Sequence, residues 1–136
     1  MAYAEYTKVP IEKTKTEIEQ TLKRYGADRF MYFTEVGKAV IVFDVKDRRL
    51  RFDLPVAAGD SEKDRKEARR KWRALFLCIK AKLESVASGI ETFEEAFLAH
   101  VVMHDGMTVY QHTQGRIEIA YKGGEIPALL PGPRQN

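Results

Sequence analysis

The first apolar residues of the chain recur at helical spacing. Pro10 suits a first helical turn, where its missing N–H would have no partner in any case, and Gly26 suits a C-terminal end. The pattern predicts a helix over residues 10–25. Its buried face is formed by four residues at spacings of seven, four and three: Ile11, Ile18, Leu22 and Tyr25.

The hydrophobic period then shortens to two. Three short segments rich in aromatic and β-branched residues follow, with turn signals between them at 36–37 and 46–48. This pattern predicts a three-stranded antiparallel meander. The predicted strands are 29–35, 38–45 and 49–54.

Alternation within these strands predicts one apolar and one mixed sheet face. In the third strand, Leu50 and Phe52 point to the apolar face, whereas Arg49 and Arg51 point to the mixed face. The first strand is apolar on both sides, so one of its aromatic residues lies on the mixed face. Whether a helix covers that face is left open by the sequence.

A long helix is predicted over residues 61–88. Asp60 or Ser61 caps its start, with Asp64 three residues after Ser61, and Gly89 ends it. Its first two turns carry almost no apolar residue, so we expect them to project into solvent. An apolar stripe at helical spacing is expected to be buried: Ala68, Trp72, Leu75, Phe76, Ile79, Leu83 and Val86.

A shorter helix is predicted after Thr92, because Thr92 and Glu95 form a capping-box pattern before an apolar run. Its buried face is expected to contain Phe93, Ala96, Phe97 and Val101.

The pattern of residues 109–122 predicts a last helix, with Thr108 as its candidate N-terminal cap. Gly115 weakens such a helix by about 1 kcal/mol, and the alternation of Ile117, Ile119 and Tyr121 also permits a strand. Residues 126–133 are expected to form an extended tail that packs down through two leucines, Leu129 and Leu130.

Together these elements predict the α+β class: an N-terminal helix, a three-stranded antiparallel β-meander, a long helix and two shorter helices. The length of 136 residues fits a single domain over 1–136, with flexible ends at about 1–8 and 131–136. A composition of 44% hydrophobic and 32% charged residues excludes wholesale disorder, collagen and a disulfide scaffold.

Positive charge is concentrated in one part of the chain. The protein has 23 Lys and Arg against 20 Asp and Glu, a net charge of +3. Residues 61–84 alone contribute +5, with nine basic and four acidic residues. Such a segment indicates a polyanionic partner, and phosphate backbones are the most common one.

The single cysteine, Cys78, allows no internal disulfide and indicates a reducing cytoplasm. Its apolar neighbours predict a buried, inert thiol. No stretch of 18 uncharged apolar residues occurs, so no membrane span is expected.

The basic part of the long helix is the strongest functional signal. Four of its residues fall on neighbouring turns and are candidate phosphate contacts: Lys66, Arg69, Arg70 and Arg73. The alternative is that these charges only keep an exposed helix in solution. Trp72 is expected in the core, and stacking on a base is the alternative.

The mixed sheet face is a second candidate for nucleic-acid binding. Arg49 and Arg51 would contact phosphates, and Tyr32 and Phe33 would stack on bases, as in sheets that bind single strands.

Three histidines lie close together in the sequence, and His100 and His104 have the i, i+4 spacing of a helical metal site. The residues between them do not form an HExxH motif. We therefore expect surface or capping roles for these histidines, and neither a metal site nor a cofactor. Motifs for phosphate loops, dinucleotide binding and nucleophilic catalysis do not occur in the sequence.

Segments spread over nearly the whole chain carry a further signal. They include Tyr6-Thr7-Lys8-Val9-Pro10, Trp72-Arg73-Ala74-Leu75, residues 79–86, residues 89–97 and the tail from Ile126-Pro127 to Leu130-Pro131. In this order they resemble a family of small, uncharacterised proteins of tailed bacteriophages and prophages. The resemblance implies a phage or prophage origin and a helical segment over 109–122, and it supplies no catalytic residue.

We therefore expect a non-enzymatic phage accessory protein in the host cytoplasm that binds nucleic acid, with single-stranded DNA favoured, during replication or recombination. The alternative is a protein-interaction module, such as an inhibitor of a host antiviral defence complex. A host or phage protein partner and a homodimer both remain open.

Overall fold

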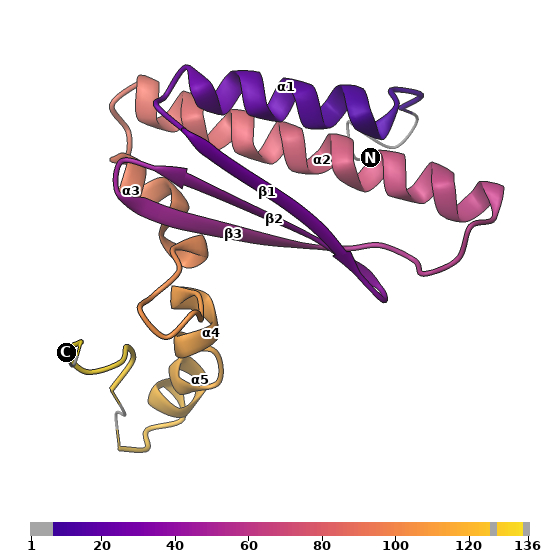
Figure 1. The fold of residues 1–136 in the computed structure, drawn as a ribbon. Helices are drawn as coiled ribbons and strands as arrows, with labels where there is room; N and C mark the ends of the chain where they lie inside the picture. The colour runs from indigo at the N-terminus through magenta and orange to yellow at the C-terminus, as the bar shows by residue number, and fades with distance from the viewer. Residues whose placement is uncertain (1–6, 126–127, 135–136) are drawn as a thin grey trace.

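The α+β class is confirmed by the computed structural model, which describes residues 7–125 and 128–134. The elements follow one another in the predicted order (Figure 1). They are α1 (Ile11–Lys23), β1 (Arg29–Glu35), β2 (Lys38–Val45), β3 (Arg48–Pro55), α2 (Glu62–Ala87), α3 (Phe93–Phe97), a 3-10 turn η1 (Leu98–His100), α4 (Val109–Thr113) and α5 (Arg116–Tyr121). Parts of the predicted flexible ends, residues 1–6 and 135–136, lie outside the described residues.

The three strands form the predicted meander, in the order β1-β2-β3 with antiparallel pairing. Phe33 lies opposite Val40, and Val40 lies opposite Asp53 on the next strand. Lys46 and Asp47 join β2 to β3 with positive φ angles of 51° and 64°. Two such residues give a turn whose twist matches that of the strands it connects.

Both long helices pack on the same face of the sheet (Figure 1). α1 and α2 run side by side and both begin at the end of the sheet where the β1–β2 turn lies. The core between the helices and the sheet centres on Phe43, which is fully buried. Its ring lies 6.1–6.5 Å, centroid to centroid, from the rings of Phe30, Phe52 and Phe97.

The apolar stripe of α2 forms the helical side of this core. Trp72, Leu75, Phe76, Ile79 and Leu83 are buried, so the prediction of a core position for Trp72 is confirmed. The Ser61 hydroxyl accepts a hydrogen bond of 3.1 Å from the Asp64 N–H and caps the helix as predicted. The first two turns after this cap are largely exposed, also as predicted.

The prediction for Cys78 was wrong: this residue is exposed. Its neighbours Phe76 and Ile79 are buried, but successive helical residues point about 100° apart. Apolar neighbours in the sequence therefore do not bury a residue that falls outside the stripe.

The helix after Thr92 is shorter than predicted. Its capping box is present, and Phe93, Ala96 and Phe97 are buried. Val101, however, lies beyond the helix and forms an antiparallel bridge with Leu50. The N–H of Val102 donates a hydrogen bond of 2.8 Å to the Arg49 carbonyl. This segment pairs with β3, because the edge strand offers backbone groups that a continued helix would leave without partners.

Residues 109–122 are helical rather than extended, but the predicted single helix is interrupted. Gly115 has a φ of 80° and separates α4 from α5, because a left-handed residue breaks the helical hydrogen-bond series. These two helices project away from the sheet (Figure 1).

The two tail leucines do not pack down as expected, since Leu129 and Leu130 are 41% and 43% exposed. Residues 126–127 of this tail lie outside the described residues.

Replacement of Phe43 by Ala is expected to lower the free energy of unfolding by about 3–5 kcal/mol. The change leaves a cavity among three aromatic rings. Urea denaturation followed by circular dichroism measures this loss. Val36→Ala, at a turn residue that is 93% exposed, is the control and should change the free energy by less than about 0.5 kcal/mol. Equal effects of the two substitutions would contradict the placement of the core.

Candidate nucleic-acid interface

The four predicted basic residues of α2 lie on one side of the helix, next to α1. Their spacing of three and four residues places Lys66, Arg69, Arg70 and Arg73 on adjoining turns. Arg73 reaches α1, where its Nη1 donates to the Glu17 carboxylate at 3.1 Å. The structure therefore brings these four residues together.

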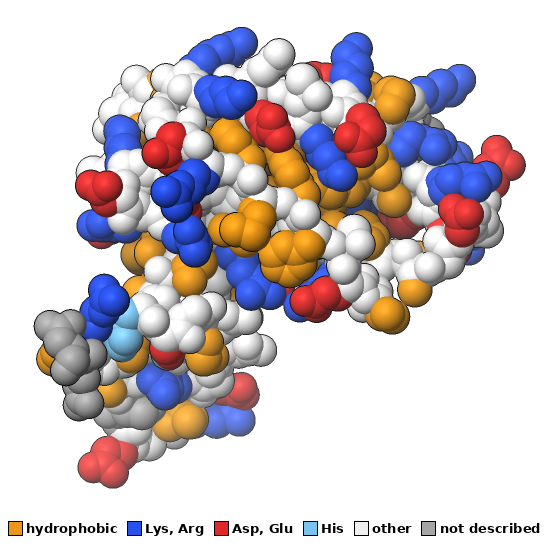
Figure 2. All heavy atoms as spheres, in the orientation of Figure 1, with side chains coloured by type: hydrophobic (Ala, Val, Ile, Leu, Met, Phe, Trp, Pro, Cys, Tyr) orange, Lys and Arg blue, Asp and Glu red, His pale blue; other side chains and the backbone are white. Residues whose placement is uncertain are grey.

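Two of the four remain available to an external anion. Arg70 is paired with Glu67 through an Nε–Oε2 hydrogen bond of 3.0 Å, and this contact lowers the pKa of the Glu67 carboxyl. Among the residues that the structure describes, Lys66 and Arg69 form no ion pair. Figure 2 shows basic side chains along both helices with acidic side chains among them.

Charge is nevertheless unbalanced at the end of the molecule where α1 and α2 begin. Residues 7–17 and 60–73 together contain ten basic and six acidic side chains, a net charge of +4. The N-termini of both helices lie at this end (Figure 1), and their dipoles add partial positive charge. We call this region, residues 7–17 and 60–73, the basic end.

Arg49 and Arg51 do not join the basic end. They point to the sheet face opposite the helices, because alternate residues of β3 point to opposite faces and Leu50 and Phe52 enter the core. The basic residues of α2 and of β3 therefore do not form one continuous surface. We call the face that carries Arg49 and Arg51 the outer face.

The outer-face arginines are neutralised by acidic neighbours. Arg49 makes two hydrogen bonds to Asp44, of 2.9 and 3.1 Å, and Arg51 donates to Asp53 at 2.8 Å. The hydrogen bond from Arg49 holds the pKa of Asp44 below its usual value of 3.8. Both carboxylates thus stay charged, and phosphate would have to compete with them.

The two predicted stacking residues are on opposite faces. Tyr32 points into the core, with its ring 6.1 Å from that of Trp72, and Lys15 lies over both rings at 5.2–5.4 Å. Burial, and then the nearby Glu19 carboxylate, raise the pKa of the Tyr32 hydroxyl above its ordinary range. Tyr32 is thus partly buried against the core, on the side of the sheet opposite to Phe33. Phe33 is 40% exposed on the outer face, beside Met31 at 51%.

A groove at the basic end was not anticipated from the sequence. It has a volume of about 490 Å³ and runs between the first turns of α1 and α2, above the β3–α2 loop. Its apolar surface comes from Ile11, Val56, Ala57, Ala68 and Trp72. A sequence signal for this groove was available in the small residues of the loop at 57–59 and in Ala68 of the apolar stripe. Such residues leave space beside the large side chain of Trp72. We call it the α1–α2 groove.

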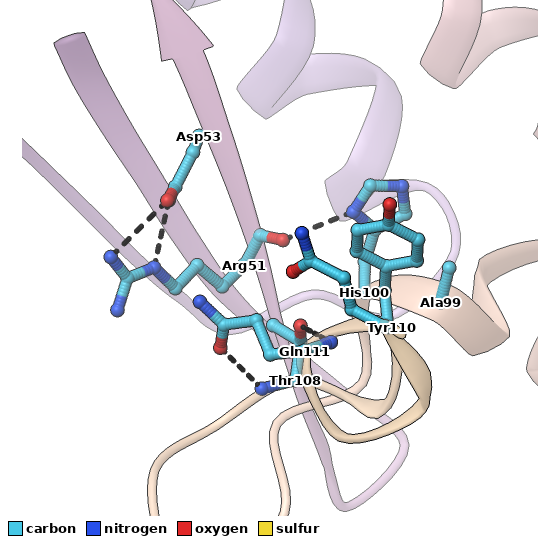
Figure 3. A pocket seen from close by; sticks show the side chains of 8 residues that line it. Arg51, Asp53, Ala99, His100, Thr108, Tyr110 and Gln111 are labelled. Atoms are coloured by element: carbon cyan, nitrogen blue, oxygen red, sulfur yellow. Dashed lines mark hydrogen bonds and ion pairs between the residues drawn. The ribbon is translucent and has the colours of Figure 1, made fainter. Parts of the chain in front are cut away.

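A second pocket, of about 500 Å³, lies between β3 and α4 (Figure 3). His100 forms one wall. Its ring stacks on Phe52 at a centroid distance of 3.8 Å, and its Nδ1 is 3.2 Å from the Arg51 carbonyl. Tyr110 and Gln111 from α4 also line the pocket.

The histidines have separate partners. His100 packs against Phe52, whereas His112 Nε2 lies 2.8 Å from the Asp105 carboxylate. Over residues 7–125 and 128–134, no three His, Cys, Asp or Glu side chains gather as metal ligands. Within the same residues, no helix is long and apolar enough to cross a membrane.

Comparison with known proteins adds no assignment, because no family model, curated protein or solved structure matches the chain.

The position of His100 predicts a pH-dependent stability. Burial lowers the pKa of its ring below 6.5, and this outweighs the contact with the Arg51 carbonyl. As the pH falls below 6.5, the unfolded state takes up the proton first. The free energy of unfolding should therefore decrease as the pH falls, until the pH is below the pKa of His100 in the folded state. Below that pH, His100 is protonated in both states and contributes no further change.

Urea denaturation between neutral pH and mildly acidic pH measures this effect. His100→Gln should reduce the pH dependence of the unfolding free energy, whereas His104→Gln, at an exposed residue, should leave it as in the wild type. An unchanged slope in His100→Gln would contradict the assignment.

Proposed function

We propose that this protein binds nucleic acid through the basic end, without catalysing a reaction. The observation that carries the proposal is the net charge of +4 on residues 7–17 and 60–73, with Lys66 and Arg69 unpaired among the described residues. Lysine and arginine side chains on a rigid helix can contact successive phosphates, and each contact releases condensed counterions.

The proposed interface differs from the predicted one in its extent. It keeps Lys66 and Arg69 as the main phosphate contacts, and Arg70 and Arg73 lie beside them with acidic partners. It leaves out Arg49, Arg51 and Phe33, which lie across the sheet, and Tyr32, which is partly buried against the core. Phosphate contacts of this kind position a strand without reading its sequence.

A role in phage replication or recombination, within the host cytoplasm, follows from the resemblance to phage and prophage proteins and stays a prediction. A protein that coats or guides a nucleic acid during these processes needs affinity for phosphates and no catalytic group. The net positive charge of the basic end supports the first of these requirements.

Binding should be weakened by removing the two unpaired charges. Lys66→Gln/Arg69→Gln is expected to lower the affinity for a fluorescently labelled oligonucleotide by roughly tenfold at about 50 mM salt. The slope of log K against log salt concentration should decrease by about 1.4 for a single strand, which is about 0.7 for each lost phosphate contact. Fluorescence anisotropy at several salt concentrations measures both quantities.

Arg29→Gln/Lys122→Gln is the matched control, because it removes the same charge from β1 and from the residue that follows α5, away from the basic end. This variant should keep both the affinity and most of the slope. No binding of single strand or duplex by the wild type at low salt would refute the proposed function, and equal losses in both variants would refute the interface.

The outer face favours a second candidate function, a protein-interaction module. Met31 and Phe33 are exposed there between charges that are already paired. An apolar patch with balanced charge suits a protein partner better than a polyanion. An inhibitor of a host defence complex would use such a surface.

This candidate is tested by capturing partners from nuclease-treated host lysate. Phe33→Ser should lose a bound protein, whereas Val36→Ser, at a turn residue 93% exposed, should retain it. Loss of every partner on nuclease treatment alone would leave nucleic-acid binding as the explanation.

A further inference from the structure

The α1–α2 groove opens among the cations proposed to contact phosphates. Arg65 and Arg69 of α2 and Lys15 of α1 line it, together with the carboxylates of Glu12 and Asp64. Lys15 pairs with Glu12 and Arg65 with Asp60, whereas Arg69 forms no ion pair among the described residues, and Lys66 is one turn of helix from Arg69. An anionic polymer held on Lys66 and Arg69 therefore passes the mouth of the groove. The groove itself is largely apolar, so it does not take a phosphate.

Space and chemistry in the groove suit a flat apolar group. Ala57 and Ala68 present only methyl groups toward the space, and Val56 and Ile11 extend the apolar surface. Trp72 is 4% exposed and forms part of the lining. Since Lys15 lies 5.2 Å above the Trp72 ring, that ring is held in place by a cation–π contact.

We infer that the α1–α2 groove accepts an unstacked base of a single-stranded nucleic acid whose phosphates lie on Lys66 and Arg69. The inference rests on the proposed function and adds the class of substrate. It also places single-strand recognition between the two helices, instead of on the sheet face where the sequence predicted it.

A single strand fits this arrangement better than a duplex. In a duplex both faces of each base are stacked, and the phosphates reach the protein before the bases do. Extrusion of a paired base costs unpairing and unstacking energy, whereas a single strand presents its bases at little cost. An aliphatic side chain of an acidic peptide is the competing occupant, but its carboxylates are spaced less regularly than the phosphates of a nucleic acid.

The test fills the groove and keeps the charges. Ala57→Phe places a ring in the groove from an exposed loop residue, and Ala58→Phe places the same ring on the neighbouring residue, which does not line the groove. Oligothymidylate and a duplex of equal length are the probes. Trp72 is the only tryptophan of the chain, so its fluorescence reports occupation of the groove.

For the wild type and Ala58→Phe, we expect oligothymidylate to quench Trp72 fluorescence and to bind more tightly than the duplex. Ala57→Phe should lose the quenching and weaken oligothymidylate binding by roughly tenfold, with duplex binding unchanged. Circular dichroism confirms that each variant is folded.

Equal affinity for single strand and duplex, unaffected by Ala57→Phe, would overturn the inference and leave the proposed function intact. Quenching by a leucine-containing acidic peptide but not by oligothymidylate would assign the groove to a peptide and overturn it as well. No binding of either nucleic acid would refute the proposed function itself.

Discussion

Packing of α1 and α2 on one face of the sheet is the constraint on which the rest of this structure depends. Trp72 and its apolar neighbours on α2 are buried against the aromatic residues of β1, β2 and β3. Burial of this stripe removes a large apolar surface from water and fixes the rotation of α2 about its axis. The same rotation decides which way every charged residue of α2 points.

One consequence is the separation of two charged surfaces. Once Leu50 and Phe52 enter the core, Arg49 and Arg51 must lie on the other side of the sheet from α2. The outer face then balances its own charges through Asp44 and Asp53, whereas the basic end keeps an excess. A protein of net charge +3 thus has one region of net charge +4, whereas the charges of Arg49 and Arg51 on the outer face are paired.

The parallel arrangement of α1 and α2 creates the groove. Both helices begin at the same end (Figure 1), and small residues, Ala57, Gly59 and Ala68, line part of the space between their first turns. Trp72 closes the floor of this space from within the core. Charge and concavity therefore coincide at one end of the molecule, and this coincidence supports a nucleic-acid ligand more than the total charge does.

The sequence by itself determined the local elements of this protein. Periodicity located α1, the three strands and α2, and the side-chain caps Ser61 and Thr92 marked helix starts correctly, because these signals depend on residues near one another in the chain. It also indicated that Lys66, Arg69, Arg70 and Arg73 share one side of a helix.

Only the tertiary structure decided which separate segments meet. The exposure of Cys78, the bridge from Val101 to Leu50 and the break at Gly115 each depend on neighbours or backbone angles that no local pattern specifies. The same holds for the distance between α2 and the arginines of β3. Alternation in a strand shows that its two sides differ, but which side the helices cover is settled by packing across the whole core.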